Sequence, residues 1–136
     1  VYMSNRELIE LRPPGLSIQY THDKQKIKLG NSTLHIMHTP GHSPGGQCIY
    51  SDPHLIAGDT LFINGCGRCD LRGSEPDKMY KSLQRIKNLP EDTIIYPGHN
   101  YADLSKDTLE NQKQSNRFLA ASSLEHFYRL RMGKRS

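Results

Sequence analysis

The sequence predicts an α+β fold, in which a mixed sheet is covered by helices on its outer face. Two observations support this prediction. Short runs of alternating apolar and polar residues, typical of strands, fill the chain from residue 16 to residue 57. Apolar residues at helical spacing begin only after residue 74, and a β-branched run at 93–96 lies between the helices. Strands therefore come first and then alternate with helices, an order in which loops at the strand ends carry the chemistry.

The N-terminal half combines one expected helix with several expected strands. Ser4, followed three residues later by a glutamate, forms a capping-box pattern that predicts a short helix over 5–11, ended by Pro13-Pro14-Gly15. Alternating runs then predict antiparallel strands, with turns at Gly30-Asn31-Ser32 and Ser51-Asp52-Pro53. These strands are expected at 16–20, 27–29, 34–38, 47–51 and 54–57.

Three helices are expected in the second half of the chain. The first should run from about 76 to 88, because Pro76 suits a first helical turn and apolar residues follow at helical spacing. A polar helix should begin at Ser105 and continue through Arg117. A last helix is expected around 124–130, where apolar side chains again recur at helical spacing.

Length and charge exclude several classes of protein. A chain of 136 residues fits one domain. No apolar stretch approaches the roughly 20 residues that a membrane-spanning helix needs, and the N-terminus has no secretory-signal pattern, so we expect a soluble protein without a membrane partner. The net charge is +4, and the excess cations gather at Arg129, Arg131, Lys134 and Arg135 without interleaved aromatic residues. A nucleic-acid partner is therefore not expected.

The cysteines indicate the cellular compartment. The chain has three cysteines, Cys48, Cys66 and Cys69. An odd number of cysteines suits a reducing cytoplasm, in which disulfides are rare. The Cys-x-x-Cys spacing of the last two occurs in redox centres and in halves of zinc sites, but the chain has no second pair, and flanking glycines indicate a loop. We therefore expect structural or incidental thiols and a cytoplasmic location.

Three segments share one design, a single ligand-type side chain in a turn that follows an apolar strand. They are Thr39-Pro40-Gly41-His42, Ala57-Gly58-Asp59-Thr60 and Tyr96-Pro97-Gly98-His99. Imidazole and carboxylate groups bind zinc and ferrous iron, and turns with little side-chain bulk let a metal approach the backbone. The separations, 17 residues from His42 to Asp59 and 40 from Asp59 to His99, are too long for a zinc finger. They indicate ligands that converge from different strands.

Other interpretations of the histidines stay open. A loop histidine is by itself more often a surface or hydrogen-bonding residue than a ligand, so no single segment carries the metal hypothesis. His35 and His38 lie three residues apart in an alternating strand run, which places their side chains on opposite faces of the sheet. We expect His38 to pack near the site or to be a plain strand residue.

Taken together and in this order, the three segments resemble the later metal-binding motifs of the metallo-β-lactamase superfamily, most closely those of its glyoxalase II-like hydrolases. The similarity extends over 27–118, and its most specific part is Gly58-Asp59-Thr60-Leu61-Phe62-Ile63-Asn64-Gly65-Cys66-Gly67-Arg68. The resemblance implies two zinc ions, with His42 on the first, His99 on the second, and Asp59 bridging both as the catalytic carboxylate. It also implies a hydrolase in which a metal-bound hydroxide attacks a thioester.

The first metal-binding motif of that superfamily, His-x-His-x-Asp-His, is absent from these 136 residues. The resemblance therefore implies that residues 1–136 form a single, partial metallo-β-lactamase-like domain, the C-terminal half of an αββα sandwich from a longer hydrolase. Half of a sandwich exposes the sheet face that packs on the other half, so self-association is expected. The alternative is a non-catalytic fragment that binds metal weakly.

The same resemblance suggests substrate contacts. In glyoxalase II-like enzymes, a basic residue after the Gly-Cys-Gly turn and a tyrosine two residues after the last histidine hold glutathione, and Arg68 and Tyr101 occupy these positions. A second tyrosine of that pattern is replaced by Asp70, which argues against glutathione itself. The plainest alternative role of Arg68 is an exposed salt bridge with Asp70. Its planar guanidinium equally suits the phosphate of a phosphopantetheine-linked acyl thioester.

Two groups of related enzymes supply further alternatives. The Gly-Cys-Gly-Arg-Cys-Asp-Leu run is similar to that of hydrolases found beside polyketide synthases, which implies a carrier-linked acyl thioester as the substrate. Persulfide dioxygenases share the metal-binding motifs, and they use a triad of histidines and carboxylate with open positions for oxygen. Iron in place of zinc would therefore indicate an iron-dependent persulfide dioxygenase.

Overall fold

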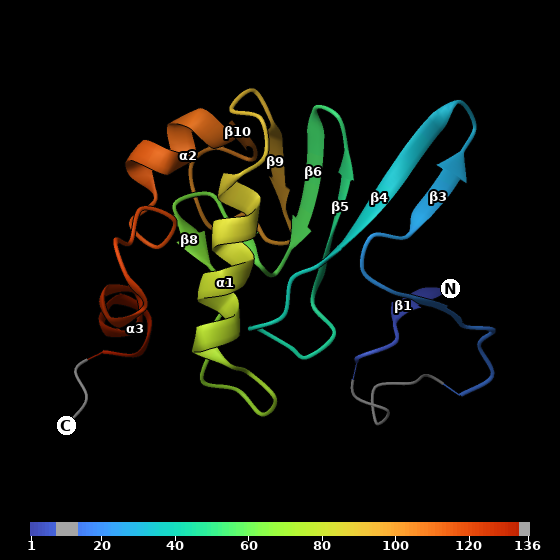
Figure 1. Ribbon diagram of the computed structural model, residues 1–136, viewed down its shortest axis with the longest axis horizontal. Helices are drawn as coiled ribbons and strands as arrows, with labels where there is room; N and C mark the ends of the chain where they lie inside the picture. Colours follow the sequence, from blue (N-terminus) through green and yellow to red (C-terminus); the bar gives the residue numbers. More distant parts are fainter. Residues whose placement is uncertain (8–13, 134–136) are drawn as a thin grey trace.

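The computed structural model describes residues 1–7 and 14–133 (Figure 1). Within this range the strands are β1 (Tyr2–Ser4), β2 (Gln19–Thr21), β3 (Lys26–Leu29), β4 (Ser32–His38), β5 (Gln47–Ser51), β6 (His54–Gly58), β7 (Leu61–Phe62), β8 (Gly65–Cys66), β9 (Ile94–Pro97) and β10 (Asp107–Thr108). The helices are α1 (Pro76–Lys87), α2 (Leu109–Ser115) and α3 (Leu124–Met132). Strands dominate the first half of the chain and helices the second, as predicted.

A six-stranded sheet in the order β10-β9-β6-β5-β4-β3 forms the centre of the molecule. Its neighbouring strands are antiparallel except for β6 and β9, which run parallel because the chain between them crosses over through α1 (Figure 1). The hairpin of β3 and β4 turns at Gly30, whose φ of +59° suits a residue without a Cβ. A mixed sheet with outer helices confirms the predicted α+β class.

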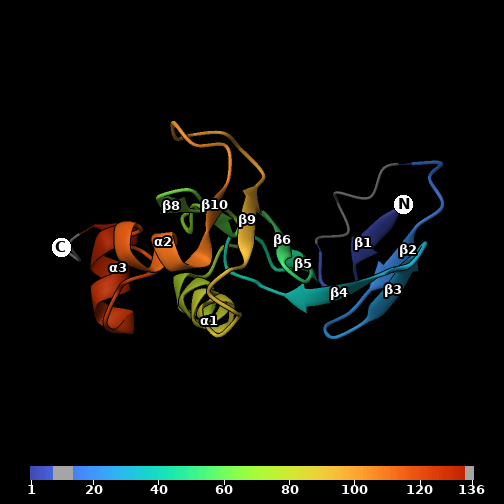
Figure 2. The ribbon, with the colours of Figure 1, turned by 90° about the horizontal axis from the view of Figure 1, so that it is seen from above.

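Helix α1 covers one face of this sheet (Figure 2). Pro76 opens the helix and Asp77 lies in its first turn, both favourable at a helix N-terminus. Met79, Leu83 and Ile86 recur at helical spacing and are fully buried. They belong to one hydrophobic core together with Cys48, Leu55, Ala57 and Ile95 from the sheet. The amphipathic pattern that predicted this helix is therefore the pattern that joins it to the sheet.

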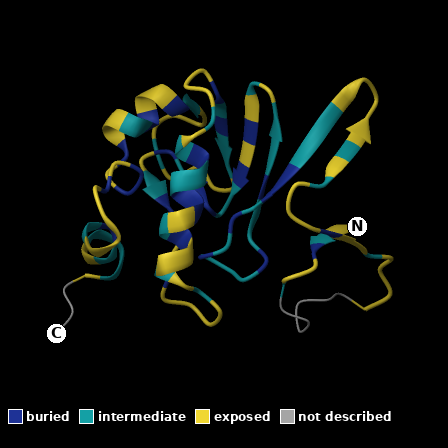
Figure 3. Cartoon of the chain, in the orientation of Figure 1, coloured by how far each residue is buried: buried dark blue, intermediate teal, exposed yellow. Residues whose placement is uncertain are grey.

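The opposite face of the sheet carries a row of apolar side chains. Ile56 of β6 is directly opposite Ile49 of β5 and Tyr96 of β9. Ile56 is 53% exposed although it lies in a central strand, and Figure 3 shows buried and exposed residues alternating along β6. In the part of the chain that the structure describes, this face is thus only partly covered.

The C-terminal helices complete the core beside α1. Ser123 caps α3 by accepting a hydrogen bond from the His126 N–H, which fixes the start of the helix. Phe127 of α3 is fully buried, and its ring lies 5.8 Å from that of Tyr80 on α1 and 6.4 Å from that of Phe118. The last helix is confirmed, and these aromatic contacts attach it to α1.

The N-terminal segment differs from the prediction. Residues 2–4 form a strand, and residues 5–7 form a turn and bend, so the helix predicted over 5–11 is wrong where it is described, whereas 8–11 lie outside the described residues. Ser4 Oγ accepts from the N–H of Arg6, two residues on, which favours a local turn over a helix N-cap. In addition, β1 pairs with β2 in a parallel sheet of two strands, so the expectation of antiparallel pairing fails there.

The helix predicted from Ser105 through Arg117 is shorter than expected. Residues 107–108 pair with β9 as β10, and Thr108 becomes the N-cap because its side chain accepts from the Asn111 N–H. At the other end Asn116 is extended and fully buried, and its amide donates to the carbonyls of Phe62 and Gly65. These long-range hydrogen bonds end the helix, and local spacing does not encode them.

Helix length in the described residues also bears on membranes. None of the three helices has both the length and the apolar character that crossing a bilayer requires.

Asp23 supports a prediction about acid stability. Burial alone raises the pKa of Asp23, but hydrogen bonds from the His38 N–H and Arg85, with the charge of Arg85, outweigh it and hold the pKa below its ordinary value. The contribution of ionised Asp23 to the stability of the fold is therefore complete above its unfolded-state pKa of about 3.9. This contribution is lost as the pH falls through the folded-state pKa of Asp23. Because both side chains are more than a third exposed, solvent screening keeps the effect small.

We expect Asp23→Asn to lower the free energy of unfolding at neutral pH by less than about 1 kcal/mol. We also expect a smaller loss of stability than in the parent between about pH 5 and pH 2. Urea unfolding across this pH range measures both effects, with the exposed Asp103→Asn as the control. Identical pH profiles for parent and Asp23→Asn would contradict the role of this carboxylate.

Candidate metal centre

The sheet topology brings the three ligand-type residues to one edge. Asp59 directly follows β6 and His99 follows β9, and the carboxyl ends of these parallel neighbours meet because Gly58 pairs with Pro97. Strand β4 runs in the same direction as β6, since both are antiparallel to β5, so the loop with His42 starts at the same edge. The convergence predicted from spacing is thus produced by strand direction.

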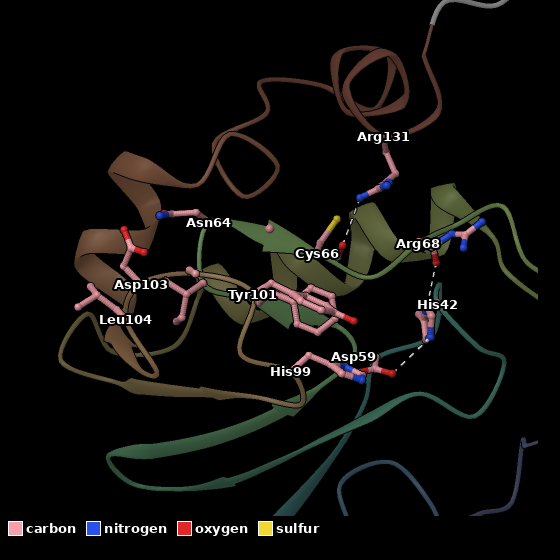
Figure 4. Close-up of a pocket in the computed structure, with 14 residues that line it drawn as sticks. His42, Asp59, Asn64, Cys66, Arg68, His99, Tyr101, Asp103, Leu104 and Arg131 are labelled. Atoms are coloured by element: carbon pink, nitrogen blue, oxygen red, sulfur yellow. Dashed lines mark hydrogen bonds and ion pairs between the residues drawn. The ribbon is translucent and has the colours of Figure 1, made fainter.

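The two histidines contact opposite oxygens of one carboxylate (Figure 4). His99 Nδ1 lies 2.8 Å from Asp59 Oδ1, and His42 Nε2 lies 3.5 Å from Asp59 Oδ2. The Arg68 carbonyl lies 2.9 Å from His42 Nδ1 and can only accept, so that nitrogen carries the proton. His42 therefore turns Nε2 toward the carboxylate, the orientation that metal-binding histidines obtain from a carbonyl behind them.

Glycines allow this close approach. A Cβ on Gly98 would lie 2.8 Å from Asp59 Oδ1, and one on Gly67 would lie 2.0 Å from the Asp59 carbonyl oxygen and 2.9 Å from His42 Cβ. Any larger residue at either position would displace the carboxylate or the imidazole. The glycine-rich character of the ligand segments thus has a steric cause.

The donor set fits a metal ion in its chemistry. Two donors, each about 2.0–2.1 Å from a tetrahedral zinc ion, lie roughly 3.3 Å apart, close to the 3.5 Å between His42 and Asp59. The 2.8 Å contact of His99 with Asp59 is instead a direct hydrogen bond. As the side chains stand, the described residues contain no group of three or more His, Cys, Asp or Glu side chains that could hold a metal ion. His99 would have to exchange its hydrogen bond for a metal bond.

A cavity of about 880 Å³ opens in front of these residues. His42, Asp59, Arg68, His99 and Tyr101, which are the site residues predicted from the sequence, all line it (Figure 4). Their shared position is an observation, whereas their roles as ligands or substrate contacts stay predictions. The cavity has the size of a pocket for a small organic ligand.

Arg68 is engaged by Asp70. Its Nε and Nη2 donate to the two carboxylate oxygens at 2.9 and 3.0 Å, and both side chains are exposed. The hydrogen bonds and the charge of Asp70 raise the pKa of Arg68, and the hydrogen bonds from Arg68 hold the pKa of Asp70 below its usual value. The predicted exposed salt bridge is therefore present, and a substrate anion would have to compete with Asp70 for Arg68.

Aromatic rings surround His99. The Tyr101 ring stacks on the imidazole with 5.0 Å between centroids and 4° between planes, although Tyr101 is 73% exposed. Phe62 meets both rings edge-on, at 5.8 Å from His99 and 5.2 Å from Tyr101. Tyr101 therefore contacts the expected ligand and also lies at the cavity surface.

Several lining residues were missed in the sequence. Phe62 belongs to the motif at 58–68 that the sequence singled out. The spacing of residues in that motif does not show that the Phe62 ring contacts His99 and Tyr101. Leu104 gives the cavity an apolar wall, and Arg131 enters from α3, where its guanidinium donates to the Cys66 carbonyl at 3.3 Å. In the sequence, Arg131 was one of several C-terminal cations, and only the packing of α3 brings it to the cavity.

The cysteines play no part as thiolates. Cys66 and Cys69 are free and buried, and burial raises the pKa of Cys66 to about 11 and, with the neighbouring Cys66, that of Cys69 to about 12. Burial likewise raises the pKa of Cys48 to about 11. A buried thiol that stays protonated at neutral pH is a poor nucleophile and a poor ligand. These environments agree with the expectation of structural thiols.

Family membership follows from a direct match. The model of the metallo-beta-lactamase superfamily matches residues 5–99, more than half of the chain and all three ligand segments. The chain belongs to the metallo-beta-lactamase superfamily.

Individual relatives show which branch is similar. A protein described as "Probable polyketide biosynthesis zinc-dependent hydrolase BaeB" from Bacillus velezensis is 33% identical over 98% of this chain and 60% of its own length. A hydroxyacylglutathione hydrolase from Enterobacter sp. is 49% identical over 55% of this chain and 27% of its own length. The chain thus spans less than two thirds of either relative.

Solved structures support the fold. ETHE1 from Myxococcus xanthus matches 96% of this chain and 56% of its own chain with a TM-score of 0.84, and its 23% identity bears on the fold alone. TTHA1623, solved in a di-iron-bound form, matches 86% of this chain and 63% of its own, with a TM-score of 0.72 and 27% identity. The predicted resemblance to this superfamily is confirmed.

Proposed function

We propose that this chain supplies one side of the metal centre of a zinc-dependent thioesterase, with His42, Asp59 and His99 as the ligands. The observation that carries the proposal is the contact of both histidines with one carboxylate, at 3.5 and 2.8 Å, from three separate loops. Bound zinc supplies a Lewis acid that polarises a carbonyl and lowers the pKa of water to near 7. Asp59 suits the bridging role, because its two oxygens face different histidines.

The chain's own residues hold the reacting groups in place. The Arg68 carbonyl accepts from His42 Nδ1 and so keeps Nε2 as the nitrogen directed at the site. Phe62 and Leu104 line the cavity with apolar surface that suits the acyl part of a thioester.

A carrier-linked acyl thioester is the substrate that these residues favour. Asp70 stands where glyoxalase II-like enzymes have a tyrosine that helps hold glutathione. The similarity to the polyketide-associated hydrolase extends over 98% of this chain, whereas that to the hydroxyacylglutathione hydrolase extends over 55%. Hydroxyacylglutathione is the competing substrate, and hydrolysis assays with both thioesters compare them directly.

Metal analysis tests the proposal first. We expect the 136-residue chain, purified without chelators, to bind zinc and to lose it in His42→Ala and His99→Ala, as measured by elemental analysis. About two zinc ions per chain would mean that further ligands within this chain complete the site. Zinc binding that survives both substitutions, or no binding at micromolar zinc, would refute the proposal for this chain.

An iron-dependent persulfide dioxygenase is the second candidate. The di-iron form of TTHA1623 motivates it, and two histidines with one carboxylate form the ligand set of many non-haem iron oxygenases. Oxygen uptake with glutathione persulfide by iron-loaded protein would favour the dioxygenase. Zinc-dependent thioester cleavage without oxygen uptake would favour the hydrolase. Metal binding with neither activity would favour a non-catalytic fragment.

We propose that Arg68 binds the phosphate of a phosphopantetheine group in competition with Asp70. We expect Arg68→Gln to weaken phosphopantetheine binding about tenfold, since it removes a charge-assisted hydrogen bond. Isothermal titration calorimetry measures this, with Arg129→Gln as the control, because Arg129 is also paired and exposed but does not line the cavity. Equal affinity of Arg68→Gln and the parent would rule out this contact.

Self-association of the isolated chain is the last part of the proposal. The row of Ile49, Ile56 and Tyr96 offers an apolar face that a second copy of the chain can cover. We expect Ile56→Lys to shift the chain toward monomer in sedimentation velocity experiments. Leu29→Lys, on the edge strand β3, controls for added charge. A parent that is monomeric at the same concentration would contradict the proposal.

A further inference from the structure

We infer that Phe62 is a positioning residue for the metal centre, because it holds the imidazole of His99 and the ring of Tyr101 in their stacked arrangement. The inference rests on the proposed function, in which His99 is a ligand. It concerns a residue that is not itself a metal donor and that lies on β7, away from the loop of His99.

His99 needs support from outside its own loop. Its side chain is 50% exposed, and the contacts that the structure gives it are Asp59 on one side and the rings of Tyr101 and Phe62 on the other. Tyr101 lies on the same exposed loop and is itself 73% exposed. Stacking between two residues of one exposed loop cannot by itself orient the His99 ring relative to the carboxylate.

Phe62 provides the missing reference point. Its ring stands nearly perpendicular to both others, at 83° to His99 and 87° to Tyr101, which directs ring edges toward ring faces. The Phe62 carbonyl accepts a hydrogen bond from the amide of Asn116, a fully buried residue that also binds the Gly65 carbonyl. The β7–β8 hairpin is therefore attached to the core, and through Phe62 it fixes the two rings.

Removing the Phe62 ring should affect His99 and not His42. His42 obtains its orientation from the Arg68 carbonyl, and Phe62 has no ring contact with it among the described residues. Loss of the Phe62 ring should therefore release His99 and leave His42 in place. Loss of a hydrogen-bonding outer partner of a metal ligand typically weakens metal binding by about 10- to 100-fold, and we expect the loss of this ring contact to lie near the lower end of that range.

Zinc affinity and the ring signals of His99 test the inference together. We expect Phe62→Ala to weaken zinc binding at least about tenfold in competition with a chromophoric chelator. Phe62→Tyr keeps the ring and should bind like the parent. Leu71→Ala, which truncates an exposed apolar side chain that does not line the cavity, should also bind like the parent. Circular dichroism confirms that each variant is folded at the temperature used.

The NMR signals of the His99 ring give a readout without metal. In the parent, the neighbouring rings should shift the His99 ring protons, and Phe62→Ala should move these signals toward those of a free histidine while the His42 signals stay in place. A parent that fails to bind zinc would refute the proposed function, and the His99 signals would then decide the inference alone. The inference is overturned if Phe62→Ala binds zinc as tightly as the parent. If the parent binds no zinc, the inference is overturned when the His99 signals are the same in Phe62→Ala and the parent.

Discussion

Replacing Asp59 with asparagine is expected to reduce the zinc bound per chain to background. The substitution keeps the shape of the side chain but removes the negative charge that both histidines face at 2.8 and 3.5 Å. An amide cannot bridge two cations as a carboxylate does. The loss of affinity should exceed the roughly 10- to 100-fold effect of removing an outer partner of a ligand. Elemental analysis after gel filtration measures the zinc content, and any thioesterase activity should disappear with it.

The matched control is Asp103→Asn, which removes the same charge from the lining of the same cavity. Asp103 is exposed, so its substitution should leave the zinc content at the parent's level. Equal zinc content in Asp59→Asn and the parent would refute the bridging role. Zinc lost equally from both variants would show that only the total charge of the cavity matters.

Replacing Gly67 with alanine is expected to have the largest effect on stability. The new Cβ would lie 2.0 Å from the Asp59 carbonyl oxygen and 2.9 Å from His42 Cβ, and the carbonyl is backbone that cannot rotate away. Relief of this clash must separate the two segments that carry the expected ligands. We expect the free energy of unfolding to fall by about 3 kcal/mol or more, at the upper end of overpacking effects. Urea unfolding measures the loss, and zinc binding should be lost with it.

Gly65→Ala is the control for this substitution. It lies in the same stretch, and its added Cβ would meet Phe62 Cβ at 3.6 Å, an ordinary contact distance. We expect a change in stability of less than about 1 kcal/mol. If Gly67→Ala were as stable as Gly65→Ala and still bound zinc, the tight packing of Asp59 against His42 would not be a requirement of the site.

The accuracy of the sequence-based predictions followed the range of the interactions involved. Helices α1 and α3 were predicted because their signals are local, namely Pro76 at an N-terminus and apolar residues at helical spacing. The helix expected over 5–11 is wrong for residues 5–7, which form a turn and bend where Ser4 Oγ accepts from the Arg6 N–H. The helix expected from Ser105 through Arg117 is too long, because residues 107–108 pair with the distant strand β9 as β10.

By itself, the sequence determined the superfamily and the α+β class, and it singled out the residues that meet at one edge of the sheet. Ligand-type side chains after apolar strands, in glycine-rich turns, predict a metal centre without any knowledge of distances. Only the tertiary structure decided how the residues are used: which oxygen of Asp59 faces each histidine, that Asp70 engages Arg68, and that Phe62 reaches His99. The physical reason is that local spacing encodes dihedral preferences and periodicity. Contacts across 26 residues, as from His42 to Arg68, or across 40, as from Asp59 to His99, arise from packing and strand direction.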